Sequence, residues 1–221
     1  MISSSHKLIW VGINGTGTTS MAPLLMKWKL KGTPTQPNQK HQTYIEALDF
    51  AKEKKLNLDD YFKFTFIRNP WDRQVGRYFH DRRVGDIPQD VSFDRWIKWF
   101  RDRYKDKGGF DIAFKDSAAR RAWCCGLSGA NKPKYLVRWD WPCFYWCCNE
   151  DMEIEMDFIG RVEKIEEDFK ILSKKIGIDI PLPHKNKSDR GPYQDYFTKE
   201  NRDIVEHIFE KDIEHFGYTF D

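Results

Sequence analysis

A single arginine stands at the end of a strongly apolar segment of the chain. Residues 62–67 have the character of a buried strand, Arg68 follows them, and Asn69 and Pro70 end the strand. Pro70 suits the first turn of a helix, because its missing N–H would be unpaired there anyway, and we expect a helix from Trp71 to about Arg83. Open α/β sheets bind ligands at the carboxyl ends of their strands. Arg68 could therefore hold an anion such as a phosphate, although an arginine in an ordinary surface turn is the alternative.

A glycine-rich loop forms the second chemically suggestive segment. Residues 7–11 read as a short buried strand, residues 12–20 (GINGTGTTS) as a loop, and an apolar helical pattern begins at Met21. This order is typical of a phosphate cradle, since glycines let backbone N–H groups approach an anion and the helix dipole adds to them. The G-x-x-x-x-G spacing of a Walker A loop is present, but Thr18 stands where that motif needs lysine, while Thr19 fits its Ser/Thr position. The loop suits a phosphate that is held rather than transferred; a turn without a ligand is the alternative.

Taken together, these segments resemble sulfotransferases that use 3′-phosphoadenosine 5′-phosphosulfate (PAPS), in their carbohydrate (Golgi-type and bacterial) branch. Residues 15–20 (GTGTTS) are similar to the 5′-phosphosulfate loop, and residues 67–75 (IRNPWDRQV) to the 3′-phosphate segment. Three further blocks agree in chain order: KHQT at 40–43, DFIGRVE at 157–163 with EDF at 167–169, and HKNKS at 184–188 with the ending DIEHFGY at 212–218.

The resemblance implies a binding site for PAPS and for its product, 3′-phosphoadenosine 5′-phosphate (PAP). It places the 5′ end of the cofactor on the glycine-rich loop, where backbone N–H groups and threonine and serine hydroxyls can hold it, and the 3′-phosphate on Arg68. The residues expected to bind the cofactor are Gly15, Thr16, Gly17, Thr18, Thr19, Ser20, Arg68, Arg73 and Ser188. For Arg73, an ion pair on the helix surface, with Asp72 or another neighbour, is an equal alternative.

The expected reaction is an in-line transfer of a sulfuryl group to a hydroxyl or amine of an acceptor, which the resemblance suggests is a carbohydrate. His41 is the candidate base, because an imidazole titrates near neutral pH and because its position matches the family's histidine at the start of a helix. No metal is required in this scheme, unlike triphosphate chemistry, which relies on Mg²⁺.

The chain departs from the family pattern at two positions. Gly15 stands where many members have a lysine that neutralises the bridging oxygen, and losing such a contact can cost about 10²–10³ in rate. Gly76 stands where the family usually has a serine, a contact that Arg73 or Arg77 could replace. We expect another cation to substitute for the missing lysine, and the candidates are Lys40, Lys115 and Lys187.

The alternation of strands and helices predicts an α/β fold: a P-loop-like three-layer sandwich with a mostly parallel central sheet flanked by helices. Residues 1–221 are expected to form one domain, with a divergent acceptor-side region at about 81–156. A third strand is expected at 158–160. Apolar residues at helical spacing predict further helices, which are an aromatic one over 91–104 with Ser92 as its N-cap, one over 164–176, and a last one capped by Thr198.

Composition narrows the function classes. The chain has 221 residues, a formal charge of +3 and 32% charged residues, which is mildly basic and lacks the excess expected of a nucleic-acid binder. No apolar run approaches the roughly 20 residues that span a bilayer, and no signal-peptide pattern precedes the first strand. We therefore expect no nucleic-acid partner, no membrane segment and a cytoplasmic location. The sequence leaves the oligomeric state open.

The middle of the chain is rich in cysteine and aromatic residues. The chain has five cysteines, an odd number, which disfavours a disulfide framework. Four of them form two adjacent pairs, a spacing that does not fit a C-x-x-C zinc site. We therefore expect buried thiols, with a metal or redox role as the alternative. The cysteines are Cys124, Cys125, Cys143, Cys147 and Cys148. The aromatic residues could form a platform for a sugar, or equally a packed core or a dimer contact. They are Trp123, Trp139, Trp141, Phe144, Tyr145 and Trp146.

Two other function classes stay open on the sequence. A P-loop nucleotide or small-molecule kinase is disfavoured by Thr18, which replaces the Walker lysine, and ATP turnover with Mg²⁺ would revive it. A non-catalytic nucleotide-binding relative of the sulfotransferases is favoured by the absence of lysine at Gly15. Sulfate transfer to any acceptor would exclude it.

Overall fold

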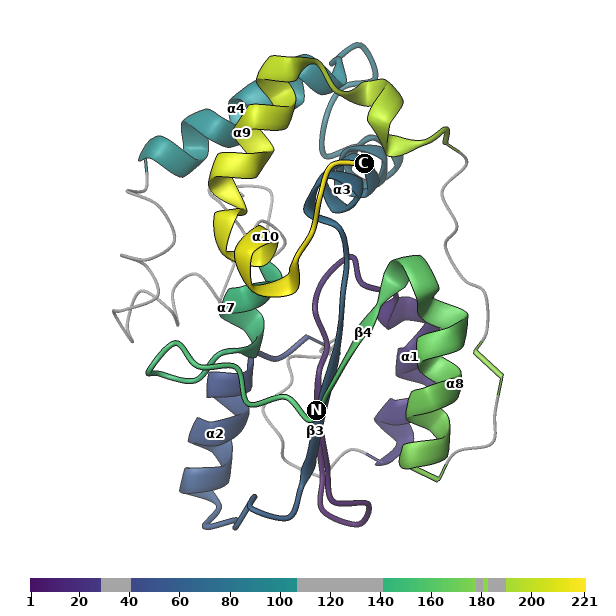
Figure 1. Ribbon diagram of the computed structural model, residues 1–221, viewed down its shortest axis with the longest axis vertical. Helices are drawn as coiled ribbons and strands as arrows, with labels where there is room; N and C mark the ends of the chain where they lie inside the picture. Colours follow the sequence, from purple (N-terminus) through teal and green to yellow (C-terminus); the bar gives the residue numbers. More distant parts are fainter. Residues whose placement is uncertain (29–40, 107–140, 178–180, 183–189) are drawn as a thin grey trace. The chain divides into compact units, whose positions relative to one another are not determined.

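The computed structural model describes residues 1–28, 41–106, 141–177, 181–182 and 190–221 (Figure 1). The chain divides into two compact units. The first comprises Met1–Arg68 and Cys143–Lys187, and the second comprises Asn69–Pro142 and Ser188–Asp221. Both units contain buried apolar side chains. A single domain over the whole chain stays a prediction.

The first unit is built on a four-stranded sheet in the order β1–β2–β3–β4. The strands β2 (Leu8–Val11), β3 (Phe62–Ile67) and β4 (Phe158–Arg161) run parallel to one another, as their predicted alternation with helices requires. The short strand β1 (Ile2–Ser3) pairs antiparallel with β2 and was not expected from the sequence. This mostly parallel sheet confirms the predicted α/β fold class.

Helices cover both faces of this sheet (Figure 1). The helices α1 (Thr18–Leu25) and α8 (Ile165–Lys175) lie on one face, and α2 (Tyr44–Glu53) lies on the other. Alternate residues of the strands face α1 and α8, because successive side chains of a strand point to opposite faces. The core on that side consists of Met1, Leu8, Trp10, Met21, Leu25, Phe64, Phe66, Phe169 and Leu172. The predicted helix over 164–176 is α8, and the three layers are those expected.

A short helix, α7 (Cys143–Cys147), belongs to the first unit and was not predicted, because its sequence CFYWC has no polar face. All five of its residues are buried. Cys143, Cys147 and Cys148 are buried, and none of the three takes part in a disulfide among the described residues. The expectation of buried thiols is therefore confirmed for these three, whereas Cys124 and Cys125 lie outside the described residues. The remaining short elements of this unit are the 3-10 helices η1 (Met26–Trp28) and η3 (Val162–Lys164).

The second unit is helical within the described ranges. Its helices are α3 (Pro70–Val84), α4 (Phe93–Asp106), α9 (Lys199–Ile208) and α10 (Glu210–Phe216), with the 3-10 helix η4 (Tyr193–Tyr196) before α9. The sequence predicted one helix after Thr198, but the chain bends at Phe209, so that two helices form. The predicted Thr198 cap is confirmed, since its hydroxyl accepts a hydrogen bond from the N–H of Asn201.

Stacked aromatic rings join α4 to α9. The Trp96 and Phe100 ring centroids lie 6.2 Å apart with the rings nearly parallel, at 8°, and the Phe209 ring continues the stack 5.9 Å from Phe100. All three side chains are buried. The aromatic stripe of α4 is therefore part of the core, as its helical spacing indicated, and the bend at Phe209 places this ring in the stack.

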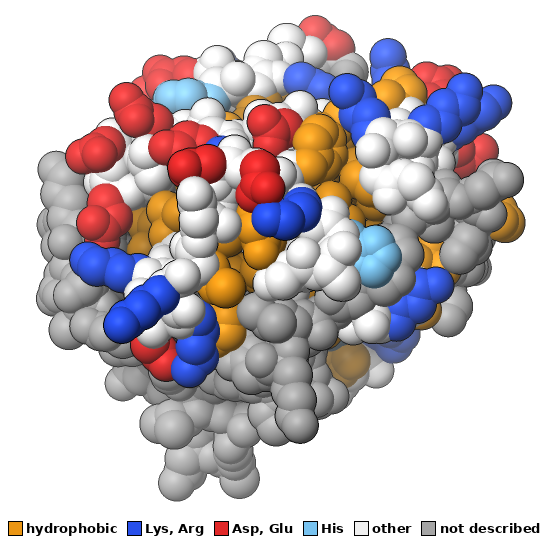
Figure 2. All heavy atoms as spheres, turned by 90° about the horizontal axis from the view of Figure 1, so that it is seen from below, with side chains coloured by type: hydrophobic (Ala, Val, Ile, Leu, Met, Phe, Trp, Pro, Cys, Tyr) orange, Lys and Arg blue, Asp and Glu red, His pale blue; other side chains and the backbone are white. Residues whose placement is uncertain are grey.

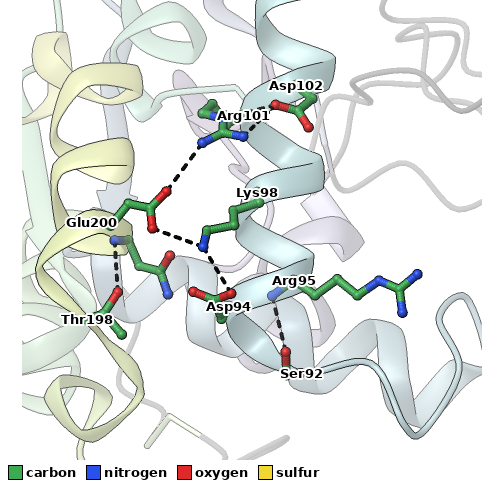
Figure 3. A network of polar contacts seen from close by, with 9 residues as sticks. Ser92, Asp94, Arg95, Lys98, Arg101, Asp102, Thr198 and Glu200 are labelled. Atoms are coloured by element: carbon green, nitrogen blue, oxygen red, sulfur yellow. Dashed lines mark hydrogen bonds and ion pairs between the residues drawn. The ribbon is translucent and has the colours of Figure 1, made fainter.

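A polar network also connects α4 and α9 (Figure 3). The Nζ atom of Lys98 lies 2.9 Å from a Glu200 carboxylate oxygen and 3.2 Å from one of Asp94. The predicted Ser92 cap is confirmed, because its hydroxyl accepts a hydrogen bond from the N–H of Arg95. Exposed ion pairs contribute about 0–1 kcal/mol each, so the buried rings contribute most of the energy that holds these helices together.

Candidate functional site

The glycine-rich loop turns sharply between β2 and α1. Gly15 and Gly17 have φ values of 80° and 78°, in the left-handed region that favours glycine. The turn closes with hydrogen bonds from the N–H groups of Ser20 and Met21 to the carbonyl of Gly17. It brings the first N–H groups of α1, for which the helix itself has no acceptor, to the carboxyl end of β2. The predicted order of strand, glycine-rich loop and helix is therefore confirmed, and a loop of this kind can bind an anion.

One hydroxyl of the loop has a structural role. The Oγ1 atom of Thr16 donates to the carbonyl of Ile13 at 2.9 Å, and the residue is 1% exposed. Because this bond uses the hydroxyl proton inside the loop, Thr16 can offer an anion only its backbone N–H. Thr18 and Ser20 are also buried.

Arg68 reaches the glycine-rich loop from the neighbouring strand. It directly follows β3, which lies parallel to and beside β2. Its Nη1 atom donates to the carbonyl of Gly15 at 3.2 Å, and the bond is partly buried. The prediction that Arg68 lies at the carboxyl end of a strand is therefore confirmed. The structure adds that its guanidinium contacts the glycine-rich loop.

His41 is tied to the start of the same loop. Its Nδ1 atom lies 2.9 Å from the carbonyl oxygen of Gly12. A carbonyl oxygen only accepts, so Nδ1 carries the proton, and a neutral ring then has its lone pair on Nε2. The ring also meets Trp146 edge-on, with the centroids 6.4 Å apart. This tautomer is the one that a general base acting through Nε2 requires.

The helix α2 fixes the chain immediately after His41. Thr43 caps this helix with a capping box, in which its hydroxyl accepts from the N–H of Glu46 and the Glu46 carboxylate accepts from the N–H of Thr43. The T-x-x-E pattern is readable in the sequence and marks the helix start more closely than apolar spacing does. His41 thus precedes the helix, near its N-terminus, as the resemblance implied.

A polar network that was not predicted supports the first turn of α2. The hydroxyl of Tyr44 donates to Glu155 at 2.5 Å, and the other oxygen of this carboxylate accepts from the side chain of Asn149 at 3.0 Å. The Tyr44 bond holds the pKa of Glu155 below its ordinary value. Burial, together with the bond to Glu155, raises the pKa of the Tyr44 hydroxyl. The network therefore contains a neutral phenol and a charged carboxylate at neutral pH.

Gln42, which lies between the candidate base and the capping threonine, is a buried amide. It is 2% exposed, and neither its nitrogen nor its oxygen has a hydrogen-bond partner among the residues that the structure describes. A buried unpaired amide is costly, and such groups occur where a ligand or a water supplies the partner. The sequence alone gave no sign of this, because Gln42 stood out there only as one residue of the KHQT segment at 40–43.

Arg73, another of the predicted cofactor residues, belongs to the second unit. Its Nη1 atom donates to the carbonyl of Trp141 at 2.7 Å, and the residue is 3% exposed. Its neighbour Asp72 forms its ion pair with Arg190 instead. Arg77 forms a close pair with Asp81, 2.6 Å away. Ser188 and the three candidate lysines, Lys40, Lys115 and Lys187, lie outside the described residues.

The aromatic residues of the middle region are buried where the structure describes them. Trp141, Phe144, Tyr145 and Trp146 are each at most 4% exposed. Each of these side chains is therefore buried and does not present an open face to a sugar. Trp123 and Trp139 lie outside the described residues.

Charges of both signs share the surface seen in Figure 2, where neither acidic nor basic side chains cover the face alone. Among the described residues, no three His, Cys, Asp or Glu side chains form a group that could hold a metal ion. None of the helices in the described ranges combines the length and apolar character that crossing a membrane requires.

The glycine-rich loop at a helix start and the parallel strands beside it define an α/β protein with a P-loop-like fold. The chain belongs to the sulfotransferase family, whose model matches residues 1–219. The resemblance seen in the motifs is therefore confirmed at the level of the family.

Three known proteins are similar to this chain. Carbohydrate sulfotransferase 10 of Xenopus laevis is 24% identical over 192 residues, which cover 76% of this chain and 50% of that protein. The chain thus spans about half the length of this curated relative. An uncharacterized protein of Archaeoglobus fulgidus is 28% identical over 131 residues, which cover 58% of this chain and 78% of that protein.

The third similar protein is a solved structure, the crystal structure of mouse sulfotransferase SULT7A1 complexed with PAP. It aligns with a TM-score of 0.53 and 14% identity, over 96% of this chain and 86% of that one. At this identity the likeness confirms the fold.

Proposed function

We propose that this protein transfers a sulfuryl group from PAPS to a hydroxyl or amine of a carbohydrate acceptor. The observation that carries the proposal is the junction of three segments at the glycine-rich loop. His41 bonds to the Gly12 carbonyl and Arg68 bonds to the Gly15 carbonyl, at 2.9 and 3.2 Å. A candidate base and a cation thus contact one anion-binding loop within one unit.

The residues present fit a phosphate-bearing nucleotide. Two left-handed glycines and the N-terminus of α1 provide N–H donors, and Arg68 adds a positive charge. A carbohydrate acceptor is supported by the similarity to carbohydrate sulfotransferase 10. PAPS is supported by the family and by the PAP in the similar mouse structure. We propose that residues 15–20 and Arg68 hold the nucleotide, and the binding roles of Arg73 and Ser188 stay predictions from the sequence.

In the transfer, the bond from sulfur to the bridging oxygen of PAPS breaks, a bond from sulfur to the acceptor oxygen or nitrogen forms, and the electron pair of the broken bond stays on the 5′-phosphate of PAP. The acceptor proton passes to Nε2 of His41, while the Gly12 carbonyl holds the ring through Nδ1–H. The imidazolium that forms keeps its bond to Gly12, so the ring does not have to turn between the steps.

The test is turnover of PAPS with a panel of carbohydrate acceptors, scored by PAP release and by mass of the product. His41→Asn keeps an amide donor near the Gly12 carbonyl but removes the base, and we expect it to lower kcat by roughly 10²–10⁴ without changing the Kd for PAP. The matched control is His215→Asn, since the His215 ring also contacts a carbonyl, that of Lys211, from an exposed position. Equal kcat values in His41→Asn and the wild type would refute the role of His41.

The glycine at position 15 favours a second candidate, a nucleotide-binding relative without catalysis. Binding of PAP with no sulfated product from any acceptor would support it. A kinase would be supported instead by ATP hydrolysis with Mg²⁺ and by binding of ATP in preference to PAP. Independence from metals stays a prediction, which turnover measured in the presence of a chelator would check. The cytoplasmic location also stays a prediction, and cell fractionation would check it.

A further inference from the structure

Gln42 is a buried amide that the proposed mechanism does not use. The residue is 2% exposed, and neither its Nε2 nor its Oε1 atom has a hydrogen-bond partner among the residues that the structure describes. Two anchors hold the backbone around it, because His41 bonds to the Gly12 carbonyl and Thr43 closes the capping box of α2. The amide therefore stands at a fixed point of the fold, directly after the candidate base.

The polar groups nearest to Gln42 in the sequence do not complete this amide. The Thr43 hydroxyl accepts from the N–H of Glu46, and the Glu46 carboxylate accepts from the N–H of Thr43. A buried donor or acceptor without a partner costs the full desolvation of that group, and Gln42 carries one of each. Native structures retain such groups where a bound molecule supplies the missing partners. The amide thus points to a ligand.

The two ends of the amide select the chemistry of this ligand. A sulfuryl or phosphate group has only acceptor oxygens, so it could pair with the amide nitrogen but not with the amide oxygen. A hydroxyl group both donates and accepts. Two neighbouring hydroxyls of a sugar ring can therefore complete Gln42, one by accepting from the nitrogen and the other by donating to the oxygen.

We propose that Gln42 binds the acceptor through two neighbouring hydroxyl groups of the sugar that receives the sulfuryl group. The inference rests on the proposed function and deepens it, because it names a residue that recognises the carbohydrate and the groups that it reads. His41 is only partly buried, so the acceptor can approach this segment from the side of the base. Because little of Gln42 is exposed, the amide meets hydroxyl groups and not the face of the ring. Its role is to bind and orient the acceptor.

Gln42→Met tests this role, because methionine has a similar length and volume but no amide. The acceptors are the methyl glycosides of glucose, galactose and mannose, assayed at saturating PAPS. For each glycoside that the wild type sulfates, we expect Gln42→Met to raise KM roughly 5–150-fold, the effect of losing two neutral hydrogen bonds. The kcat and the Kd for PAP should stay unchanged, as for an interaction made equally in the ground and transition states. The melting temperature should equal or exceed that of the wild type, since the substitution removes an amide that the described residues leave unsatisfied.

Asn201→Leu is the matched control. Asn201 is a fully buried amide of α9, in the second unit, and its side chain also has no partner among the described residues. Leucine has nearly the same shape, and we expect KM to stay unchanged. The monodeoxy forms of the same glycosides give a second test. Removing a hydroxyl that Gln42 binds should raise KM for the wild type but should have no further effect in Gln42→Met.

An unchanged KM in Gln42→Met would overturn the inference. A lower melting temperature in this variant would also overturn it, because the amide would then be satisfied within the fold, for example by a trapped water. Monodeoxy glycosides that lose equally with Gln42 and with methionine would show that another residue reads the hydroxyls. A wild type that sulfates none of the glycosides would instead refute the proposed function itself.

Discussion

Gly160 offers a test of how tightly the sheet is built behind the site. It lies in β4 directly opposite Phe66 of β3. A Cβ atom at position 160 would lie 2.7 Å from both Cδ1 and Cζ of the Phe66 ring, with Cε1 nearer still. Ordinary van der Waals contact begins at 3.4 Å, so Gly160→Ala forces the ring to retreat by at least about 0.7 Å.

The ring has little room to retreat. Phe66 is fully buried and belongs to the core under α1 and α8. Extra atoms in a filled core cost about 1–3 kcal/mol. In a chain of this length, each kcal/mol lowers Tm by roughly 2–4 °C. Because Phe66 precedes Arg68 by two positions, we also expect weaker PAP binding.

Urea unfolding followed by tryptophan fluorescence measures the cost, and a double-mutant cycle assigns it. Phe66→Leu replaces the ring by a smaller side chain and should remove much of the destabilisation caused by Gly160→Ala. We therefore expect the two substitutions to couple by at least about 0.5 kcal/mol. Gly191→Ala is the matched control, because its Cβ would make only ordinary contact, 3.4 Å from Asp195. A cost for Gly160→Ala no larger than that of Gly191→Ala, or no coupling to Phe66→Leu, would refute the reasoning.

Three further substitutions test the loop, the network at α2 and the helix pair. Gly17→Ala places a side chain at φ 78°, with its Cβ 2.5 Å from Ile165, and should cost about 1–2 kcal/mol and weaken PAP binding; unchanged melting and titration curves would contradict this. Tyr44→Phe should lower the unfolding free energy at neutral pH, and the difference from the wild type should shrink as the pH falls below about 4. The reason is that the lowered pKa of Glu155 contributes stability that is lost when this carboxylate is protonated. A pH-independent difference in unfolding free energy would argue against the bond between Tyr44 and Glu155. Phe209→Ala should cost about 3–5 kcal/mol but Glu200→Ala under about 1 kcal/mol, and the reverse order in urea titrations would show that ion pairs hold α4 to α9.

The sequence by itself determined the elements whose signals are local. The strand ending at Ile67, the helix that begins at Pro70 and the caps at Ser92 and Thr198 depend on neighbouring residues, because turn chemistry and helical periodicity act over a few positions. The glycine-rich loop between β2 and α1 was readable for the same reason. The order of these motifs along the chain indicated the family, which the match over residues 1–219 confirms.

Other features needed contacts that sequence spacing does not encode. The bend at Phe209 interrupts an unbroken apolar pattern, and the ring of this residue stacks on Phe100 from another helix. The space beside Gly160 is filled by a ring from another strand. Helix α7 has no amphipathic period because it is buried on all sides.

The site itself shows the same division. Residue types, spacing and the resemblance to the family identified His41, Arg68 and the loop as separate candidates. Only the tertiary structure decided that His41 meets Gly12 across 29 positions and that Arg68 meets Gly15 across 53. Parallel pairing of β2 with β3 places their carboxyl ends side by side, and this pairing depends on core packing over the whole unit and not on any local motif.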